Sequence, residues 1–285
     1  MLIGRVRIGE VLVLCGTVFY RGHKAVKDHR NGIFDRKLVE KQVIEQDYWS
    51  DKTGIPAFID IYAETFKAME KYIDFILSIT DKPIILNGAT AEVRLKAIKY
   101  AKEIGIIDRV VYMSINYTAT SEELDGIEGI ENLVIQAFNP GNPFPTGTLE
   151  MAEYLLEKVK EKNVKNILLM PTVLDVPGIG LALESLKFLK SKLKYPTVIA
   201  PCGVIGYWRK TKVLGEDFKK MGWASVIALS KVYGADIVIY GSIRKASKVF
   251  PIAALIESVI AYGNLFRRKP VKKNHPLNKF LRERN

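Results

Sequence analysis

Polar side chains that could bind a flat, nitrogen-containing ligand follow the apolar segments of this chain. Amides and hydroxyls predominate among them, at Asn87, Ser114, Asn116, Gln136, Asn139 and Thr172. Two carboxylates accompany them: Asp60 lies inside an apolar run, and Asp175 precedes a glycine-rich turn. An Asn side chain offers donors and an acceptor in one plane, which suits the edge of a heterocycle. The set predicts transfer of an already activated group, with the protein positioning and polarising the donor.

The residue combinations of several common enzyme classes are missing from the sequence. There is no Ser–His–Asp pattern, no paired-carboxylate signature and no Cys/His cluster with zinc-ligand spacing. Neither GxGxxG after an early strand nor GxxxxGK[ST] occurs, which weakens the nucleotide-binding alternatives. Cys15 and Cys202 each lie in an apolar segment, so we predict buried structural thiols and no metal site.

The elements that must position these side chains are eight apolar, β-branched runs, most of them followed by a helical pattern. They span residues 11–20, 57–62, 84–87, 109–115, 133–138, 167–173, 197–200 and 237–240. Most runs are continuous rather than alternating, as expected for strands that are covered on both faces. Eight strand–helix units favour an α/β protein with a closed (β/α)8 TIM barrel over an open sheet. The polar side chains would then meet at the carboxyl ends of the strands.

Length and charge indicate one domain with a basic extension. The chain has 285 residues and a net charge of +12, and no stretch resembles an interdomain linker. We predict a single barrel over residues 1–266 and a solvated basic C-terminal tail over 267–285, which is rich in Lys and Arg. Such a tail could also bind nucleic acid, anionic lipid or an acidic partner. No membrane-spanning run or signal peptide is predicted, and we expect a cytoplasmic protein.

Several segments together resemble one family. They are GTVFYRGHKAV, GIFD, EKQVIEQDYWSDKTGIP, AFIDIYAET, MEKYIDFI, DRVVYMSIN, VIQAFNP and GADIVIYG, between about Val11 and Val259. This set is similar to the H-subunit family of tetrahydromethanopterin S-methyltransferase. The resemblance implies a pterin-binding-type barrel that moves a methyl group from N5 of a reduced pterin to the cobalt of a corrinoid. The corrinoid would be carried by a partner protein, and other methyltransferase subunits and a homodimer are further family expectations.

The resemblance also implies roles for single residues. Asp60 and Asn116 would hold the pterin ring or lie near its N5, and we hypothesise that a water held by both supplies the proton that the leaving nitrogen needs. The other predicted substrate-binding residues are Asn87, Ser114, Gln136, Asn139, Thr172, Asp175, Gly203 and His23. Simpler interpretations stay open: an internal ion pair for Asp60, a turn cap for Asn116, and a surface pair for His23 with Lys24.

Two positions depart from the family pattern. The family usually has Asp-Ser where this chain has Asn87-Gly88, and Met170 or Pro171 stands where an acid is expected. Because carboxylates would accept hydrogen bonds from the amino and ring N–H groups of a pterin, their loss leaves the donor's identity open. A barrel methyltransferase for another methylated amine or one-carbon carrier is therefore a second hypothesis. A non-catalytic binding subunit that uses the basic tail is the third.

Overall fold

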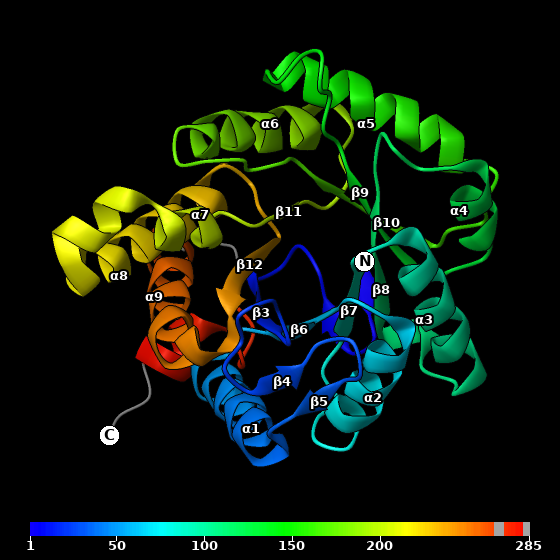
Figure 1. Ribbon diagram of the computed structural model, residues 1–285. Coiled ribbons are helices and arrows are strands. Elements are labelled where there is room, and N and C mark those ends of the chain that lie inside the picture. Colours follow the sequence, from blue (N-terminus) through cyan, green and yellow to red (C-terminus); the bar gives the residue numbers. More distant parts are fainter. Residues whose placement is uncertain (265–270, 282–285) are drawn as a thin grey trace.

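The core of the protein is an eight-stranded parallel sheet that closes into a barrel. The computed structural model describes residues 1–264 and 271–281 (Figure 1). In sheet order the strands are β10 (Asn166–Met170), β9 (Asn132–Gln136), β8 (Val110–Ile115), β7 (Ile84–Gly88), β6 (Ala57–Ala63), β3 (Val13–Val18), β12 (Ile237–Ser242) and β11 (Val198–Ile199). A parallel bridge between Leu169 and Thr197 joins β10 to the β11 segment. The predicted fold class and all eight predicted strands are confirmed, with small differences at their ends.

Helices surround the barrel, as Figure 1 shows along its axis. They are α1 (Arg36–Thr53), α2 (Phe66–Leu77), α3 (Ala91–Glu103), α4 (Ser121–Gly126), α5 (Pro145–Val159), α6 (Gly178–Lys192), α7 (Cys202–Tyr207), α8 (Arg209–Val232) and α9 (Ala246–Asn264). Short helical turns are η1 (Ile107–Arg109), η2 (Ile243–Lys245) and the π-helical η4 (Leu277–Leu281). Two small hairpins, β1 (Leu2–Ile3) with β2 (Val6–Arg7) and β4 (Val26–Asp28) with β5 (Ile33–Phe34), were not predicted.

Both faces of each barrel strand are buried, which explains the continuous apolar runs of the sequence. In β3, Val13 and Cys15 pack inside the barrel, whereas Leu14 faces the surrounding helices. The free thiols of Cys15 and Cys202 are both buried, as predicted. Side chains from several strands thus fill the barrel interior, so that it forms a packed core rather than a channel.

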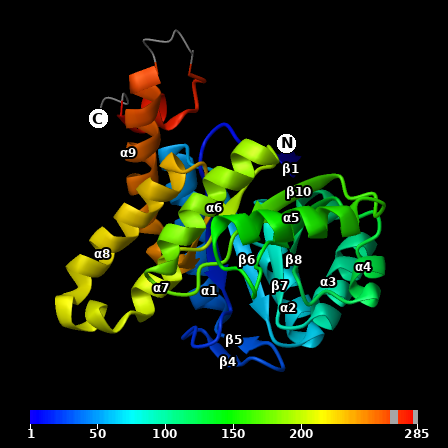
Figure 2. The same ribbon diagram turned by 90° about the horizontal axis from the view of Figure 1, so that it is seen from above.

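The two ends of the barrel differ. At the amino ends of the strands, the β1–β2 segment adds the buried side chains of Ile3 and Ile8 to the interior core. Nearer the carboxyl ends, Met113, Met170 and Ile239 are the interior side chains that retain slight exposure. They form an apolar layer, and polar side chains follow them along the chain, at Ser114, Thr172 and Ser242. The β4–β5 hairpin lies on this side, opposite the C-terminal segment (Figure 2).

Threonine caps fix the helices that follow three neighbouring strands. Thr65, Thr90 and Thr120 each accept a hydrogen bond from a backbone N–H in the first turn of α2, α3 and α4, respectively. Such caps typically contribute about 1 kcal/mol each. They hold the loops after β6, β7 and β8 close to the barrel.

The predicted basic tail is only partly an extension. Residues 271–281 pack beside the amino ends of the strands, where Leu277 is buried and the Lys272 ammonium is 2.5 Å from a Glu10 carboxylate oxygen. The solvated tail predicted from its charge is wrong for this segment, because Leu277 and Phe280 supply apolar anchors. The remaining tail residues, 267–270 and 282–285, lie outside the described residues.

The last helix also corrects an expectation. η2 and α9 together, Ile243–Asn264, are long and apolar enough by length and composition to cross a membrane, although no such run was predicted. In the structure α9 packs against α1 and α8. Its buried Glu257 forms an ion pair with Lys231 of α8 and accepts a hydrogen bond from the Leu12 N–H. The helix is therefore part of the outer layer of the barrel.

Candidate functional site

Asp60 is a buried carboxylate at the carboxyl end of the barrel, on β6. It is 2% exposed, and its Oδ2 accepts a hydrogen bond of 2.8 Å from the Thr17 hydroxyl of β3. Its Oδ1 is also buried but receives no hydrogen bond of ordinary geometry from the described residues. The sequence left open an internal ion pair for Asp60. Among the described residues, no Arg, Lys or His side chain forms one with it. Asp60 therefore retains an unused acceptor, which is costly in an apolar interior unless a ligand or water supplies a donor.

Burial raises the pKa of Asp60 to about 6, because the ionised form loses its hydration in the barrel. The hydrogen bond from the Thr17 hydroxyl and the nearby Asn87 amide act in the opposite direction and keep the shift smaller. Asn87 of β7 thus lies close to the carboxylate; in the sheet it pairs with Tyr62, two residues after Asp60 in β6. A carboxyl with this pKa changes its protonation state near physiological pH, which suits proton exchange with a bound nitrogen base.

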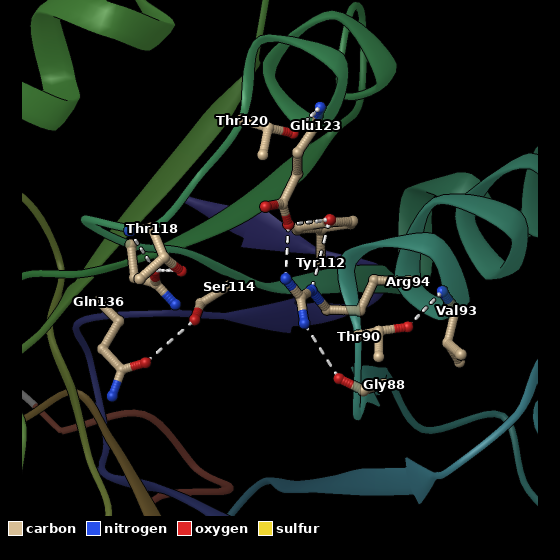
Figure 3. Close-up of polar contacts among 11 residues, drawn as sticks. Gly88, Thr90, Val93, Arg94, Tyr112, Ser114, Thr118, Thr120, Glu123 and Gln136 are labelled. Atoms are coloured by element: carbon tan, nitrogen blue, oxygen red, sulfur yellow. Dashed lines mark hydrogen bonds and ion pairs between the residues drawn. The ribbon is translucent and has the colours of Figure 1, made fainter.

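A second polar group lies across the strands that follow. The Ser114 hydroxyl of β8 donates to Oε1 of Gln136 at 3.3 Å (Figure 3), and Nε2 of Gln136 donates to the Thr172 hydroxyl at 3.1 Å. The register of β8 against β9 shifts between Met113 and Ile115, so Ser114 occupies an irregular position in its strand. Such bulges often redirect a side chain beside a functional site.

These two groups define what we call the mouth: Thr17, Asp60, Asn87, Ser114, Gln136 and Thr172. The structure thus brings together five residues that were predicted from the sequence. Thr17 was missed, although it follows Val13 and Cys15 at the two-residue spacing of the interior face. A polar residue at the end of such a series is the signal that could have identified it. The mouth offers one carboxylate, two amides and three hydroxyls.

Three other predicted residues use their side-chain oxygens in turns. Oδ1 of Asn116 accepts from the Thr118 N–H at 2.8 Å and from its hydroxyl at 2.6 Å. Oδ1 of Asn139 accepts from the Gly141 N–H, and Oδ1 of Asp175 accepts from the Gly178 N–H at the start of α6. The turn-cap interpretation of Asn116 therefore holds for its oxygen. Its Nδ2 makes no hydrogen bond to the described part of the chain.

Gly203, the remaining predicted residue near strand seven, lies in the first turn of α7, directly after β11. It has no side chain to offer a ligand, and α7 is only six residues long. A contribution from Gly203 is therefore limited to its backbone groups.

The structure corrects the prediction for His23. The imidazole is 2% exposed; its Nδ1 accepts from the Phe19 N–H at 3.2 Å, and its Nε2 lies 3.0 Å from Oε1 of Gln42 in α1. Burial lowers the pKa of His23, so the ring is neutral at pH 7. Because both ring nitrogens are used within the protein, neither the substrate contact nor the surface pair with Lys24 is realised. His23 instead fixes the loop after β3 on α1.

Two cavities flank the mouth. One of about 420 Å³ is lined by Thr172 and Asp175 with the apolar side chains of Phe138, Leu174 and Leu181. The other, of about 410 Å³, lies above β6 and includes Tyr62, Glu64 and Arg21 among its lining residues. Since β6 and β10 are four strands apart in an eight-stranded barrel, these cavities lie on opposite sides of the mouth.

A larger cavity of about 520 Å³ lies at the other end of the barrel, between the β1–β2 hairpin and the C-terminal segment. Barrel enzymes bind their substrates at the carboxyl ends of the strands, so this cavity is not the candidate site. Within residues 1–264 and 271–281, no group of three or more His, Cys, Asp or Glu side chains is arranged to hold a metal ion.

The fold occurs in solved structures of dihydropteroate synthases. A Yersinia pestis dihydropteroate synthase with a sulfonamide drug complex aligns with a TM-score of 0.65 at 10% identity, covering 92% of this chain and 99% of that chain. The Xanthomonas albilineans enzyme in complex with 7,8-dihydropteroate aligns with a TM-score of 0.60 at 14% identity, covering 88% and 95%. At these identities the likeness establishes the shared barrel alone.

Sequence comparison is more specific. Residues 3–268 match the family model described as Tetrahydromethanopterin S-methyltransferase MtrH subunit. The tetrahydromethanopterin S-methyltransferase H-subunit of Methanopyrus kandleri is 31% identical, over 93% of this chain and 90% of the relative. The H-subunit of a putative mtx methyltransferase of Methanosarcina mazei is 32% identical with the same coverage. The chain therefore belongs to the MtrH family, the H-subunits of tetrahydromethanopterin S-methyltransferase and related methyltransferases.

Proposed function

We propose that this protein transfers a methyl group from N5 of a reduced pterin, of the tetrahydromethanopterin type, to the cobalt of a corrinoid carried by a partner protein. The observation that carries the proposal is the buried, unpaired Oδ1 of Asp60 at the mouth. A reduced pterin presents ring N–H and amino donors along one edge, and such donors would satisfy this oxygen. Membership of the methyltransferase family supports the same assignment.

The mouth would act by positioning and by proton supply rather than as a nucleophile. Asn87, Ser114 and Gln136 would orient the flat ring, so that the N-methyl group faces the open end of the barrel. When the methyl group leaves, the N–C electron pair stays on nitrogen, and that nitrogen needs a proton to become a stable amine. A water held by Asp60 and by Nδ2 of Asn116 would supply this proton. The corrinoid would be brought by the partner and would accept the methyl group.

A pterin titration tests this assignment. Calorimetry with methyl-tetrahydromethanopterin should show saturable binding, and Asp60→Ala should abolish it, since the ring N–H groups lose their acceptor. Methyl transfer is then followed by the absorbance change of free cob(I)alamin. Saturable binding of a methylated amine without binding of the pterin would contradict the proposal.

A different methylated amine or one-carbon carrier is the second candidate. The mouth favours this candidate because it holds a single carboxylate. Asn87 stands where the family usually has an acid, and Met170, at the second position where an acid is expected, is an apolar side chain in the barrel interior. A smaller donor would need fewer acceptors than a pterin edge. The same titration, repeated with methylated amines, separates the two donors.

We also propose that two copies of the chain associate through α9 and that the protein works in the cytoplasm with other methyltransferase subunits. Leu255, Val259 and Tyr262 follow one another on the surface of α9 and are each more than half exposed. The neighbouring α8 exposes Met221 and Val232. Because no charged side chain interrupts the exposed face from 251 to 264, two chains of net charge +12 could meet there without direct repulsion.

Sedimentation of a Val259→Glu variant checks this interface. The wild type should sediment as a dimer, and the variant should sediment at the 32.1 kDa of one chain, because a buried unpaired carboxylate opposes association. Tyr154→Glu is the matched control, since Tyr154 is a comparably exposed aromatic residue on α5. A wild type that stays monomeric at tens of micromolar would rule the interface out.

A further inference from the structure

A buried ion pair lies directly outside the mouth, between the barrel and two helices. A guanidinium nitrogen of Arg94, on α3, is 2.6 Å from Oε1 of Glu123, on α4. The Tyr112 hydroxyl of β8 donates to the same carboxylate oxygen at 2.5 Å (Figure 3). The Arg94 and Glu123 side chains are only 12% and 5% exposed, and Tyr112 is fully buried. We refer to these three residues as the Arg94 cluster.

The Arg94 cluster contacts two of the strands that carry mouth residues, β7 and β8. A second guanidinium nitrogen of Arg94 donates to the Gly88 carbonyl at 3.0 Å, and Gly88 directly follows Asn87 in β7. Tyr112 lies two residues before Ser114 in β8. The guanidinium therefore connects the last peptide of β7 to the side of β8 and to the first turns of α4.

Gly88 permits this close approach. A Cβ atom at position 88 would lie 2.9 Å from Cγ of Arg94, which is closer than real Cβ atoms come, and 3.0 Å from its backbone nitrogen, which is tighter than most Cβ contacts. The glycine that departs from the family pattern thus makes room for the Arg94 side chain. Asn87-Gly88 and Arg94 form one structural unit.

Stability alone is a weak reason for such an arrangement. Removing an arginine and a glutamate from water carries a large desolvation penalty, and apolar replacements of buried ion pairs often match or exceed their stability. What the planar guanidinium provides is direction, since its donors point at fixed angles toward the carboxylate and the carbonyl. The Arg94 cluster thereby fixes how β7 and β8 end relative to each other.

We propose that Arg94, Tyr112 and Glu123 are positioning residues, which hold the carboxyl ends of β7 and β8 so that Asn87 and Ser114 face the bound methyl donor. The inference rests on the proposed function for its effect on turnover. Its effect on the geometry of the mouth is independent of that function. A misplacement of about 1 Å can cost about 100-fold in rate, so a residue that never touches the substrate can control turnover.

Arg94→Lys is the decisive variant, because lysine keeps the positive charge but cannot reach Glu123 and the Gly88 carbonyl together in fixed geometry. We expect kcat/KM for methyl transfer to fall about 10- to 100-fold, at a temperature where circular dichroism shows a folded protein. Tyr112→Phe removes a single hydroxyl and is the milder second variant, should Arg94→Lys not fold.

Glu257→Gln provides the matched control. Glu257 also forms a buried ion pair, 2.5 Å from Lys231 with side-chain exposures of 4% and 20%, but it lies between α8 and α9 and reaches Leu12 at the other end of the barrel. Breaking this pair should lower the melting temperature and change kcat/KM less than twofold. Equal losses of kcat/KM in both variants would reduce the Arg94 cluster to a stability element and overturn the proposal.

A second readout does not depend on activity. Asn87 lowers the pKa of the Asp60 carboxyl, so moving Asn87 away should raise that pKa further. Titration of ¹³C-labelled aspartate by NMR should show this rise in Arg94→Lys and Tyr112→Phe but not in Glu257→Gln. If the wild type transfers no methyl group and the rise is seen, the proposed function fails and the positioning role stands. If the wild type is active and neither readout separates the variants from the control, the positioning role fails.

Discussion

Replacing Asp60 by asparagine should make the protein more stable at pH 8. The same substitution should lower its methyl-transfer activity by at least about 100-fold, which is the typical effect of losing an acid–base group. The carboxylate is buried, and one of its oxygens has no hydrogen-bond partner in the described chain. Asparagine keeps an acceptor for the Thr17 hydroxyl but carries no charge, so the cost of ionisation in the barrel disappears.

The pH dependence of this gain follows from the direction of the pKa shift. Burial raises the pKa of Asp60 from its ordinary value of 3.8 to about 6, so the folded state binds the proton more tightly than the unfolded state. The stability that the wild type gains from the protonated Asp60 carboxyl is therefore fully present below pH 4, and it is lost as the pH rises through 6. The loss amounts to roughly 3 kcal/mol at pH 8. Asp60→Asn should match the wild type near pH 4 and exceed it at pH 8.

Urea unfolding of both proteins at pH 4, 6 and 8 measures the difference directly. Asp47→Asn is the matched control, because Asp47 of α1 also has a pKa raised by burial and an unpaired buried oxygen, yet it lies outside the mouth. That variant should gain stability at high pH and keep its methyl-transfer activity. A stability difference for Asp60→Asn that is the same at pH 4 and pH 8 would contradict the raised pKa.

The barrel could be predicted from the sequence because the pattern of burial is local. A strand covered on both faces needs a continuous run of apolar residues, and runs such as 109–115 and 133–138 satisfy that requirement without reference to any partner. Once eight strands are parallel, their carboxyl ends share one side of the sheet. The positions of Asp60, Asn87 and Gln136 at one end follow from this geometry.

The individual hydrogen bonds could not be predicted in the same way. Short polar side chains can bind a ligand or complete a turn with the same oxygen atom, and the sequence does not distinguish the two uses. Asn139 and Asp175 both complete turns in the structure. The partner of His23, Gln42, is 19 residues away in α1, and a buried polar pair of this kind has no local signature.

The Arg94 cluster illustrates the same limit at greater separation. Its members come from α3, β8 and α4, and Arg94 and Glu123 are 29 residues apart. The sequence Thr120-x-x-Glu123 is typical of a helix start in which the glutamate turns back to the capping residue. In the structure Thr120 caps α4, but Glu123 reaches Arg94 instead. The tertiary ion pair with Arg94 thus takes the place of the local hydrogen bond between Glu123 and the capping residue.

Replacement of Asn116 by alanine should lower methyl transfer by about 100- to 10,000-fold if its amide holds the water that protonates the leaving nitrogen. The carbonyl oxygen of Asn116 is already used by the Thr118 N–H and hydroxyl, so only Nδ2 is available to a water or a ligand. The variant also loses two hydrogen bonds of the turn, each worth about 0.5–1.5 kcal/mol. Activity must therefore be measured well below the melting temperature.

Two further variants separate the turn from the water. Thr118→Val removes one of the two hydrogen bonds to Oδ1 and leaves the Asn116 amide intact, so it should remain active. Asn116→Asp keeps an acceptor for the Thr118 N–H but loses the Nδ2 donor, so it should be as impaired as alanine. An active Asn116→Asp protein beside an inactive Asn116→Ala protein would show that Asn116 only shapes the turn after β8. The proton would then have to reach the nitrogen through Asp60 alone, and the pH dependence of kcat would follow the pKa of that single carboxyl.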